Sequence, residues 1–101
     1  MDKKRRLNAD KASAILGSLS HPTRLLIVCL LLERERFAGE LLDELGSTKG
    51  NISQHLRILQ AQGHLASRKE ANRVYYRIAD ARLGQLVATL QRLYCPGLTA
   101  H

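Results

Sequence analysis

A polar segment near the middle of the chain carries side chains suited to reading DNA. The amide groups of Asn51 and Gln54 can each bind the edge of a base at two points, typically adenine. Hydroxyl and basic side chains suit phosphate oxygens, and a helix N-terminus adds backbone donors. The candidate DNA-binding residues of this segment are Thr48, Lys49, Asn51, Ser53, Gln54, His55 and Arg57. An ordinary amphipathic helix with a polar outer face is the alternative interpretation.

A second group of basic residues flanks the expected tip of a β-hairpin, where Arg68, Lys69 and Arg73 could reach the DNA backbone or the minor groove. Residues 49–77 hold six basic side chains against one acidic side chain, a net charge of +5 in a chain of net charge +7. Release of counterions from DNA phosphates favours such a distribution. A solvated basic surface is the alternative. His55 could contact a phosphate or pack under the hairpin.

The two cysteines, Cys29 and Cys95, are the residues able to carry redox chemistry. Cys29 lies in an apolar run, where an inert buried thiol is the ordinary outcome. Cys95 lies at the end of a helix beside Pro96, in a more accessible setting. The residues alone do not bring the two sulfurs together, so two unrelated thiols remain an alternative.

Metal binding and catalysis find little support in the sequence. The chain contains no CxxC, HxxxH or HExxH pattern. Ser53 and His55 are two positions apart on a predicted helix and therefore do not face each other. Nothing combines a nucleophile, a base and an oxyanion site. We expect no cofactor, no metal site and no enzymatic activity.

The length of 101 residues predicts a single domain over 1–101 with a mostly aliphatic core, since the chain has one Phe and no Trp. No apolar run approaches the ~20 residues that cross a bilayer, and the charged N-terminus lacks the apolar region of a signal peptide. We therefore expect a cytoplasmic protein with no membrane contact. Residues 1–7 are expected to form a flexible basic arm, and residues 96–101 a flexible tail.

Apolar periodicity predicts a mainly α fold with a small β-hairpin. The expected elements are helices over 8–19, 23–32, 38–45, about 48–62 and about 81–95, and strands over 65–69 and 73–79. Residues 33–36 are expected to be a polar connection. Ser20 is expected to cap the second helix, Ser47 or Thr48 the fourth and Asp80 the last, with Asn72 left-handed in the hairpin turn.

The order ααααββα is that of a winged helix-turn-helix flanked by a helix at each end. These first and last helices carry apolar stripes that could bury each other in a two-fold dimer. Such a dimer would place two recognition helices one DNA turn, ~34 Å, apart.

Several motifs in order resemble the ArsR/SmtB family of winged-helix repressors. The resemblance rests on Leu19–Leu25 (LSHPTRL), Ser53–Leu59 (SQHLRIL), Gly63–Leu65 (GHL) and Arg73–Tyr76 (RVYY). It implies a homodimer held by the first and last helices and an operator of double-stranded DNA with two-fold symmetry. It also implies release of that operator when a signal is sensed.

The chain departs from the metal-sensing members of that family. Residues 37–41 contain no thiol where one common site has a cysteine pair. Arg82 stands where another site has a histidine after Asp80. Neither metal site is retained.

The cysteines instead resemble those of the sulfide-responsive, BigR/SqrR-type branch. Arg92–Pro96 is similar to the closing motif of that branch, and Cys29 lies at the matching place on the second helix. The resemblance implies a repressor released when the Cys29/Cys95 pair reacts with reactive sulfur species such as persulfides. A general oxidant sensor that forms a Cys29–Cys95 disulfide, and a DNA binder without a sensor, remain alternatives.

Overall fold

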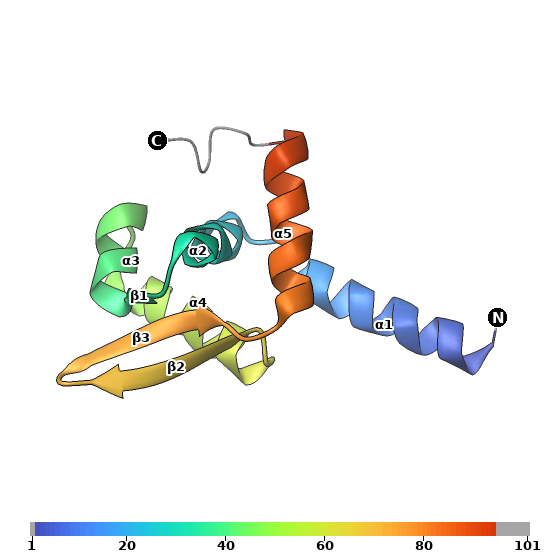
Figure 1. Ribbon diagram of the computed structural model, residues 1–101, viewed down its shortest axis with the longest axis horizontal. Coiled ribbons are helices and arrows are strands. Elements are labelled where there is room, and N and C mark those ends of the chain that lie inside the picture. The colour runs from blue at the N-terminus through green and yellow to red at the C-terminus, as the bar shows by residue number, and fades with distance from the viewer. Residues whose placement is uncertain (1, 95–101) are drawn as a thin grey trace.

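The computed structural model describes residues 2–94, which form five helices and one three-stranded antiparallel sheet whose hairpin projects at one edge of the molecule (Figure 1). The elements are α1 (Lys3–Ser18), α2 (Pro22–Glu33), β1 (Arg36–Phe37), α3 (Ala38–Leu45), α4 (Lys49–Ala61), β2 (Leu65–Glu70), β3 (Arg73–Ile78) and α5 (Ala81–Tyr94). The predicted winged helix-turn-helix with a helix at each end is confirmed. Cys95 and the predicted tail over 96–101 lie outside the described residues.

Helix α1 begins earlier than its apolar stripe predicted. The carboxylate of Asp2 accepts a hydrogen bond from the backbone N–H of Arg5 at 2.8 Å and caps the helix. The prediction of an arm over residues 1–7 is therefore wrong for residues 3–7, which form the first turns of α1. Figure 1 shows α1 extending away from the other elements. At its end Ser18 donates a hydrogen bond to Oε1 of Gln62, just beyond α4, at 2.5 Å.

Helix α2 is the central buried helix, as its apolar composition predicted. The predicted N-cap, Ser20, is wrong: its hydroxyl donates to the carbonyl of Gly17 at 2.7 Å and so closes α1. His21 is the N-cap of α2, and Pro22 starts the helix, where its missing N–H costs nothing.

Two clusters of buried residues make up the core, and α2 contributes to both. The first joins α2 to the helix-turn-helix and contains Ile27, Leu31, Leu41, Ile52, Leu56, Leu59 and Leu65. The second joins α2 to α5 and contains Leu19, Val28, Cys29, Leu83 and Val87. One face of α2 thus supports the helix-turn-helix and the adjacent face supports α5.

The turn between α3 and α4 has the expected chemistry. Gly46 ends α3 with φ of 64°, a left-handed conformation that glycine adopts without a Cβ clash. Thr48 then caps α4, since its hydroxyl oxygen accepts from the backbone N–H of Asn51 at 3.2 Å.

The hairpin matches the prediction except in its turn. Ala71, with φ of 56°, takes the left-handed conformation that we expected of Asn72. Strand β1 was not predicted. It pairs with β3 and gives the sheet order β1-β3-β2, so the polar connection expected over 33–36 ends in a strand.

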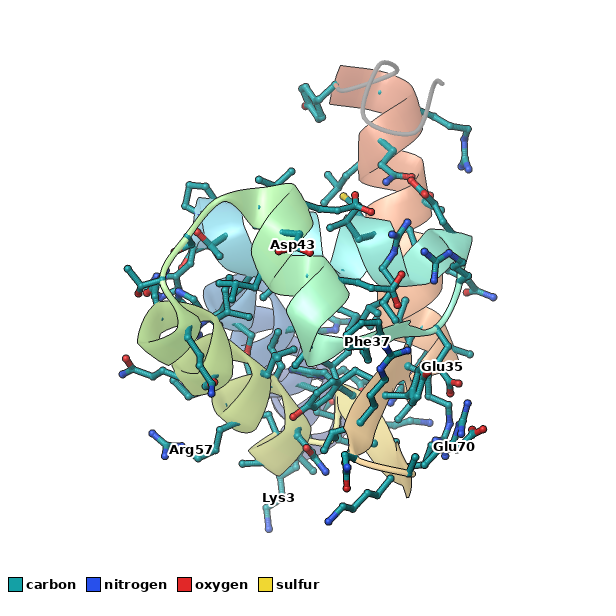
Figure 2. All side chains as sticks on the ribbon, turned by 90° about the vertical axis from the view of Figure 1, so that its left-hand side faces the viewer. Lys3, Glu35, Phe37, Asp43, Arg57 and Glu70 are labelled. Atoms are coloured by element: carbon teal, nitrogen blue, oxygen red, sulfur yellow. The ribbon has the colours of Figure 1, made fainter. Side chains whose placement is uncertain are left out.

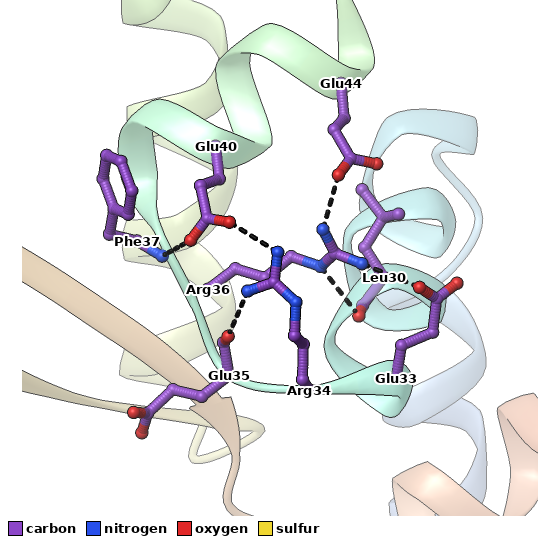
Figure 3. A network of polar contacts seen from close by, with 8 residues as sticks. All are labelled: Leu30, Glu33, Arg34, Glu35, Arg36, Phe37, Glu40 and Glu44. Carbon is purple, nitrogen blue, oxygen red and sulfur yellow. Dashed lines mark hydrogen bonds and ion pairs between the residues drawn. The ribbon is translucent and has the colours of Figure 1, made fainter.

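A network of ion pairs fixes β1 against α2 and α3 (Figure 3). Arg36 is buried, and its guanidinium donates to the Leu30 carbonyl at 3.1 Å, to Glu33 at 2.7 Å and to Glu44 at 2.5 Å. Beside it, Arg34 pairs with Glu40 at 2.6 Å. A buried arginine needs such partners because an unpaired buried charge is strongly destabilising.

Candidate nucleic-acid interface

Helix α4 presents a polar face to solvent because its apolar residues fall on one side. Ile52, Leu56 and Leu59 are buried at spacings of four and three residues, which is one face of a helix. The opposite face exposes Lys49, Ser53, Gln54 and Arg57. These four predicted site residues therefore lie together on one accessible helical surface, with hydrogen-bonding groups and two positive charges.

Two other predicted residues of this segment also hold the helix in place. The hydroxyl of Thr48 accepts the capping bond and keeps its own proton for donation. Asn51 is half-buried, and its side-chain nitrogen donates to the hydroxyl of Ser47 at 2.7 Å. Its carbonyl oxygen and second N–H remain for a base or a phosphate. Both side chains thus pre-order the start of α4.

The side chain of His55, on α4, contacts the start of α2. Its Nδ1 accepts a hydrogen bond from Nε of Arg24 at 2.9 Å, and its ring centre is 5.9 Å from that of His21. Because Nδ1 accepts, the neutral ring carries its proton on Nε2. Burial lowers the pKa of His55 below 6.5, and the charge of Arg24 and the neighbouring His21 lower it further. The His55 side chain thus packs against α2 and not under the hairpin.

The three predicted hairpin residues have different surroundings. Lys69 is exposed and makes no ion pair within residues 2–94. Arg73 is exposed, and its guanidinium lies over the ring of Phe37 at 4.3 Å. Arg68 instead forms ion pairs with Glu35, at 2.5 Å, and with Glu70. The hydrogen bonds that Arg68 donates to these two carboxylates raise the pKa of Arg68 above its ordinary value.

An apolar cavity of about 330 Å³ lies between α3 and α4, next to the exposed face of α4. Its lining consists of Ala38, Gly39, Leu42, Lys49, Ile52 and Ser53. Since Lys49 and Ser53 belong to both surfaces, the polar face of α4 is bordered by an apolar hollow.

Cys29 lies in the interface between α2 and α5. Its side chain is 3% exposed and packs in the cluster with Leu83 and Val87 of α5. Tyr94, the residue before Cys95, is the last residue of α5. The placement of Cys95 itself is outside the described residues.

Large apolar side chains remain exposed on the helices at both ends of the fold. On α1, Leu7 and Leu16 are 58% and 57% exposed, and on α5, Leu93 and Tyr94 are 68% and 76% exposed. Scattered single apolar residues on a surface need no explanation, whereas a large contiguous apolar patch marks an interaction site.

Between residues 2 and 94, no group of three or more His, Cys, Asp or Glu side chains could hold a metal ion. In that part of the chain no single helix is long and apolar enough to cross a bilayer. Together, α1 and α2 have the length and apolar composition of a membrane span, but the two helices are bent by 96° relative to each other.

Sequence reasoning did not single out Arg24 and Glu35, which hold two of the predicted site residues. Arg24 contacts His55 across 31 positions, and Glu35 contacts Arg68 across 33 positions. Helical or strand periodicity carries no information on such pairs. The opposite charges of Glu35 and Arg68 are the only sequence signal for their contact, and many other residue pairs in the chain have opposite charges.

Comparisons with known proteins agree with this geometry. Residues 21–66 match the model of the bacterial regulatory protein, arsR family. The chain is 36% identical over 87 residues to the biofilm growth-associated repressor of Xylella fastidiosa, covering 86% of this chain and 76% of that protein.

Solved structures are also similar to this chain over almost its whole length. Reduced HlyU from Vibrio cholerae has a TM-score of 0.88 and 34% identity, covering 93% of this chain and 99% of HlyU. A homodimeric winged helix-turn-helix DNA-binding domain from Mycobacterium bovis has a TM-score of 0.80 and 27% identity, covering 100% and 94% of the two chains.

Proposed function

The chain belongs to the ArsR family of bacterial regulatory proteins, and on that premise we propose that it is a homodimeric repressor released by thiol chemistry at Cys29 and Cys95. Proteins of this family are DNA-binding transcriptional regulators and not enzymes. The observation that supports the proposed operator binding is the exposed polar face of α4, held on a buried apolar face. Such binding takes place in the cytoplasm, where the DNA is.

In the proposed complex, α4 enters the major groove of the operator. Gln54 reads a base edge with its amide, while Lys49, Ser53 and Arg57 contact phosphates and neighbouring bases. Lys69 and Arg73 reach the flanking backbone from the hairpin. Thr48, Asn51 and His55 border this surface and add donors at the start and inner edge of α4. A phosphate contact by Arg68 would require it to leave its carboxylate partners.

A second copy of the chain would cover the exposed apolar residues of α1 and α5. Burial of Leu7, Leu16, Leu93 and Tyr94 removes apolar surface from water, which stabilises association. The similar Mycobacterium bovis domain is homodimeric. A two-fold axis between such copies presents two α4 helices to successive major grooves ~34 Å apart, so the operator has two-fold symmetry.

The proposed inducer is a reactive sulfur species of the persulfide class. A persulfide RSSH transfers its terminal sulfur to one cysteine thiolate, which becomes a persulfide, and RSH leaves. The second thiolate attacks the inner sulfur of that cysteine persulfide, a Cys29–Cys95 disulfide forms and hydrogen sulfide leaves. If both cysteines carry an added sulfur, the terminal sulfur of one persulfide attacks the inner sulfur of the other, a trisulfide forms and hydrogen sulfide again leaves. The two thiols are oxidised, and the transferred sulfur is reduced to sulfide.

The position of Cys29 supports a link between this chemistry and the operator. Cys29 packs against α5, while the same helix, α2, packs under α4. A bridge between α2 and the residue after α5 would pull these helices together and alter the spacing of the two α4 helices. A coupling of 1–3 kcal/mol is typical of such regulators and lowers operator affinity about 5- to 150-fold.

Mass analysis and DNA binding of the same samples test the proposal. Protein treated with glutathione persulfide is expected to gain a Cys29–Cys95 bridge and to lose affinity for a DNA duplex selected by the wild-type protein. Cys29→Ser and Cys95→Ser are expected to bind that duplex without responding. A general oxidant sensor would instead lose two hydrogens on treatment with peroxide. Its loss of DNA affinity would then be as large with peroxide as with persulfide. Wild-type binding that ignores both reagents would identify a DNA binder without a sensor.

A further inference from the structure

We propose that Glu35 is a positioning residue for DNA binding, because it holds Arg68 as a brace of the hairpin and so withdraws Arg68 from the DNA phosphates. This proposal rests on the proposed operator binding by α4 and the hairpin, but not on the thiol chemistry. It changes the role that the sequence predicted for Arg68.

The register of the sheet places Arg68 on the face that is turned away from α4. Residues directly opposite in an antiparallel pair share one face, and the pair Arg68 and Tyr75 is next to the pair Glu70 and Arg73 on that face. The neighbouring residue Ser67 is on the other face, where its hydroxyl accepts from Gln60 of α4 at 2.9 Å. The guanidinium of Arg68 therefore starts from the outer face of the sheet.

Figure 2 agrees with this register. Glu35 and Glu70 lie together on one side of the molecule, and Arg57 of α4 lies on the opposite side. The acidic partners of Arg68 are thus separated from the polar face of α4 by the sheet and the core.

All three nitrogens of the Arg68 guanidinium are occupied. Nε and Nη2 donate to the same oxygen of Glu35 at 2.9 and 2.5 Å, and Nη1 donates to Glu70. The carbon atom of the group lies 4.6 Å from the centre of the Tyr75 ring. The arginine and its two carboxylates together have a net charge of −1, so the Arg68 guanidinium is not an uncompensated positive charge.

The brace crosses the whole sheet. Glu35 precedes β1, whereas Arg68 lies on β2 at the far edge, because the strand order is β1-β3-β2. Arg68 therefore passes over Tyr75 of β3 to reach Glu35. This contact couples the free edge of the hairpin to the segment from which α3 begins.

The backbone that carries Glu35 is itself held firmly. Arg34 pairs with Glu40 and donates to the Glu35 carbonyl at 3.0 Å, and the buried Arg36 pairs with Glu44 (Figure 3). A carboxylate on such a fixed segment can orient a hairpin. The proposed role of Glu35 is to set the position of Lys69 and Arg73 relative to α4.

The test measures affinity at several salt concentrations for a labelled duplex of about 30 base pairs, long enough for two half-sites one helical turn apart. The wild-type protein selects the duplex from a random library. The variants are Glu35→Gln, Arg68→Gln, the double variant and Lys69→Gln. Lys69→Gln is the matched control, because Lys69 is the adjacent exposed cation without an acidic partner. Thermal melts and stoichiometric titration confirm that each variant is folded and fully active.

Lys69→Gln is expected to reduce the salt slope by about 1.8, because the dimer loses one phosphate contact, worth about 0.9, in each of its two subunits. Arg68→Gln is expected to leave the slope unchanged and to weaken binding about two- to fivefold, the range expected for an exposed ion pair. Glu35→Gln is expected to weaken binding equally, although it makes the protein more positive. The double variant is expected to be no weaker than either single variant, since both remove one contact.

Three results would overturn the proposal. Arg68→Gln could reduce the slope as Lys69→Gln does, which would make Arg68 a phosphate contact. Glu35→Gln could strengthen binding, which would make Glu35 a competitor of DNA. The third such result is an unchanged affinity in both variants, which would leave the ion pair between Glu35 and Arg68 without a role in DNA binding. Failure of the wild-type protein to select any duplex would reject operator binding itself and is therefore distinguishable from these results.

Discussion

The hydrogen bond between Arg24 and His55 predicts how the stability of the helix-turn-helix changes with pH. Nδ1 of His55 accepts from Nε of Arg24 at 2.9 Å, and protonation of Nδ1 abolishes this acceptor. The imidazolium would also face the positive charge of Arg24. The pKa of His55 in the folded chain is accordingly lowered below 6.5.

The sign follows from the proton balance. Above pH 6.5 the imidazole is neutral in both the folded and the unfolded chain, and the bond is present. Between 6.5 and the lower pKa of the folded chain, the unfolded chain binds a proton that the folded chain does not. The free energy of unfolding therefore falls as pH falls through that window. The donor is charged, but the bond is only half-buried, so its loss is expected to cost about 1 kcal/mol, the value for an ordinary hydrogen bond.

Urea unfolding at pH values from about 5 to 7.5, on either side of the ordinary histidine pKa, measures this effect. His55→Gln keeps an acceptor for Arg24 but does not titrate, so its stability is expected to vary less with pH than that of the wild-type protein. His55→Leu removes the acceptor and is expected to lose about 1 kcal/mol at pH 7.5, with the same reduced pH dependence. Parallel pH profiles for the wild-type protein and His55→Gln would refute this reasoning.

Three further predictions concern the DNA-binding surface and the dimer. Gln54→Ala should lose about 1–3 kcal/mol of discrimination at one base pair in each half-site of the operator, with an unchanged melting temperature because the side chain is exposed. Binding to single-base variants of the operator would measure it, and equal losses at every base pair would contradict it. Thr48→Ala should destabilise the fold by about 1 kcal/mol in urea unfolding through loss of the N-cap of α4, and Thr48→Ser should not. Leu16→Glu should shift the dimer towards monomer in analytical ultracentrifugation, because it places a charge in the proposed apolar interface. An unchanged dissociation constant would place the interface elsewhere.

The sequence predicts the elements whose signals are local. The spacing of Ile52, Leu56 and Leu59 identified the buried face of α4 and therefore its polar face. Gly46 and Thr48 correctly marked the turn before it. These features depend on the conformational preferences of a few neighbouring residues, so one sequence is sufficient to predict them.

The features that the sequence did not predict depend on distant or competing contacts. Strand β1 has two residues and exists because it pairs with β3, about 40 positions away. Ser20 has the right residue type for a cap of α2, but the end of α1 takes its hydroxyl. Asn72 is the more common left-handed residue, yet Ala71 has that conformation, because the hairpin register decides which position must turn.

The candidate site divides in the same way. The exposure of Lys49, Ser53, Gln54 and Arg57 follows from helical periodicity and was predictable. The surroundings of Arg68 were not, because charge counting along the chain treats Arg68 and Lys69 as equivalent. Folding gives one of them two carboxylates and leaves the other without an ion pair within residues 2–94.

The sharing of α2 between both core clusters has a mechanical consequence. A helix of 12 residues is about 18 Å long, so a tilt of about 5° around its midpoint displaces each end by about 0.8 Å. That displacement exceeds the tolerance of a hydrogen bond of 2.9 Å such as the one between Arg24 and His55. A small rotation imposed where α2 meets α5 therefore changes how α4 packs on α2, without any rearrangement of secondary structure.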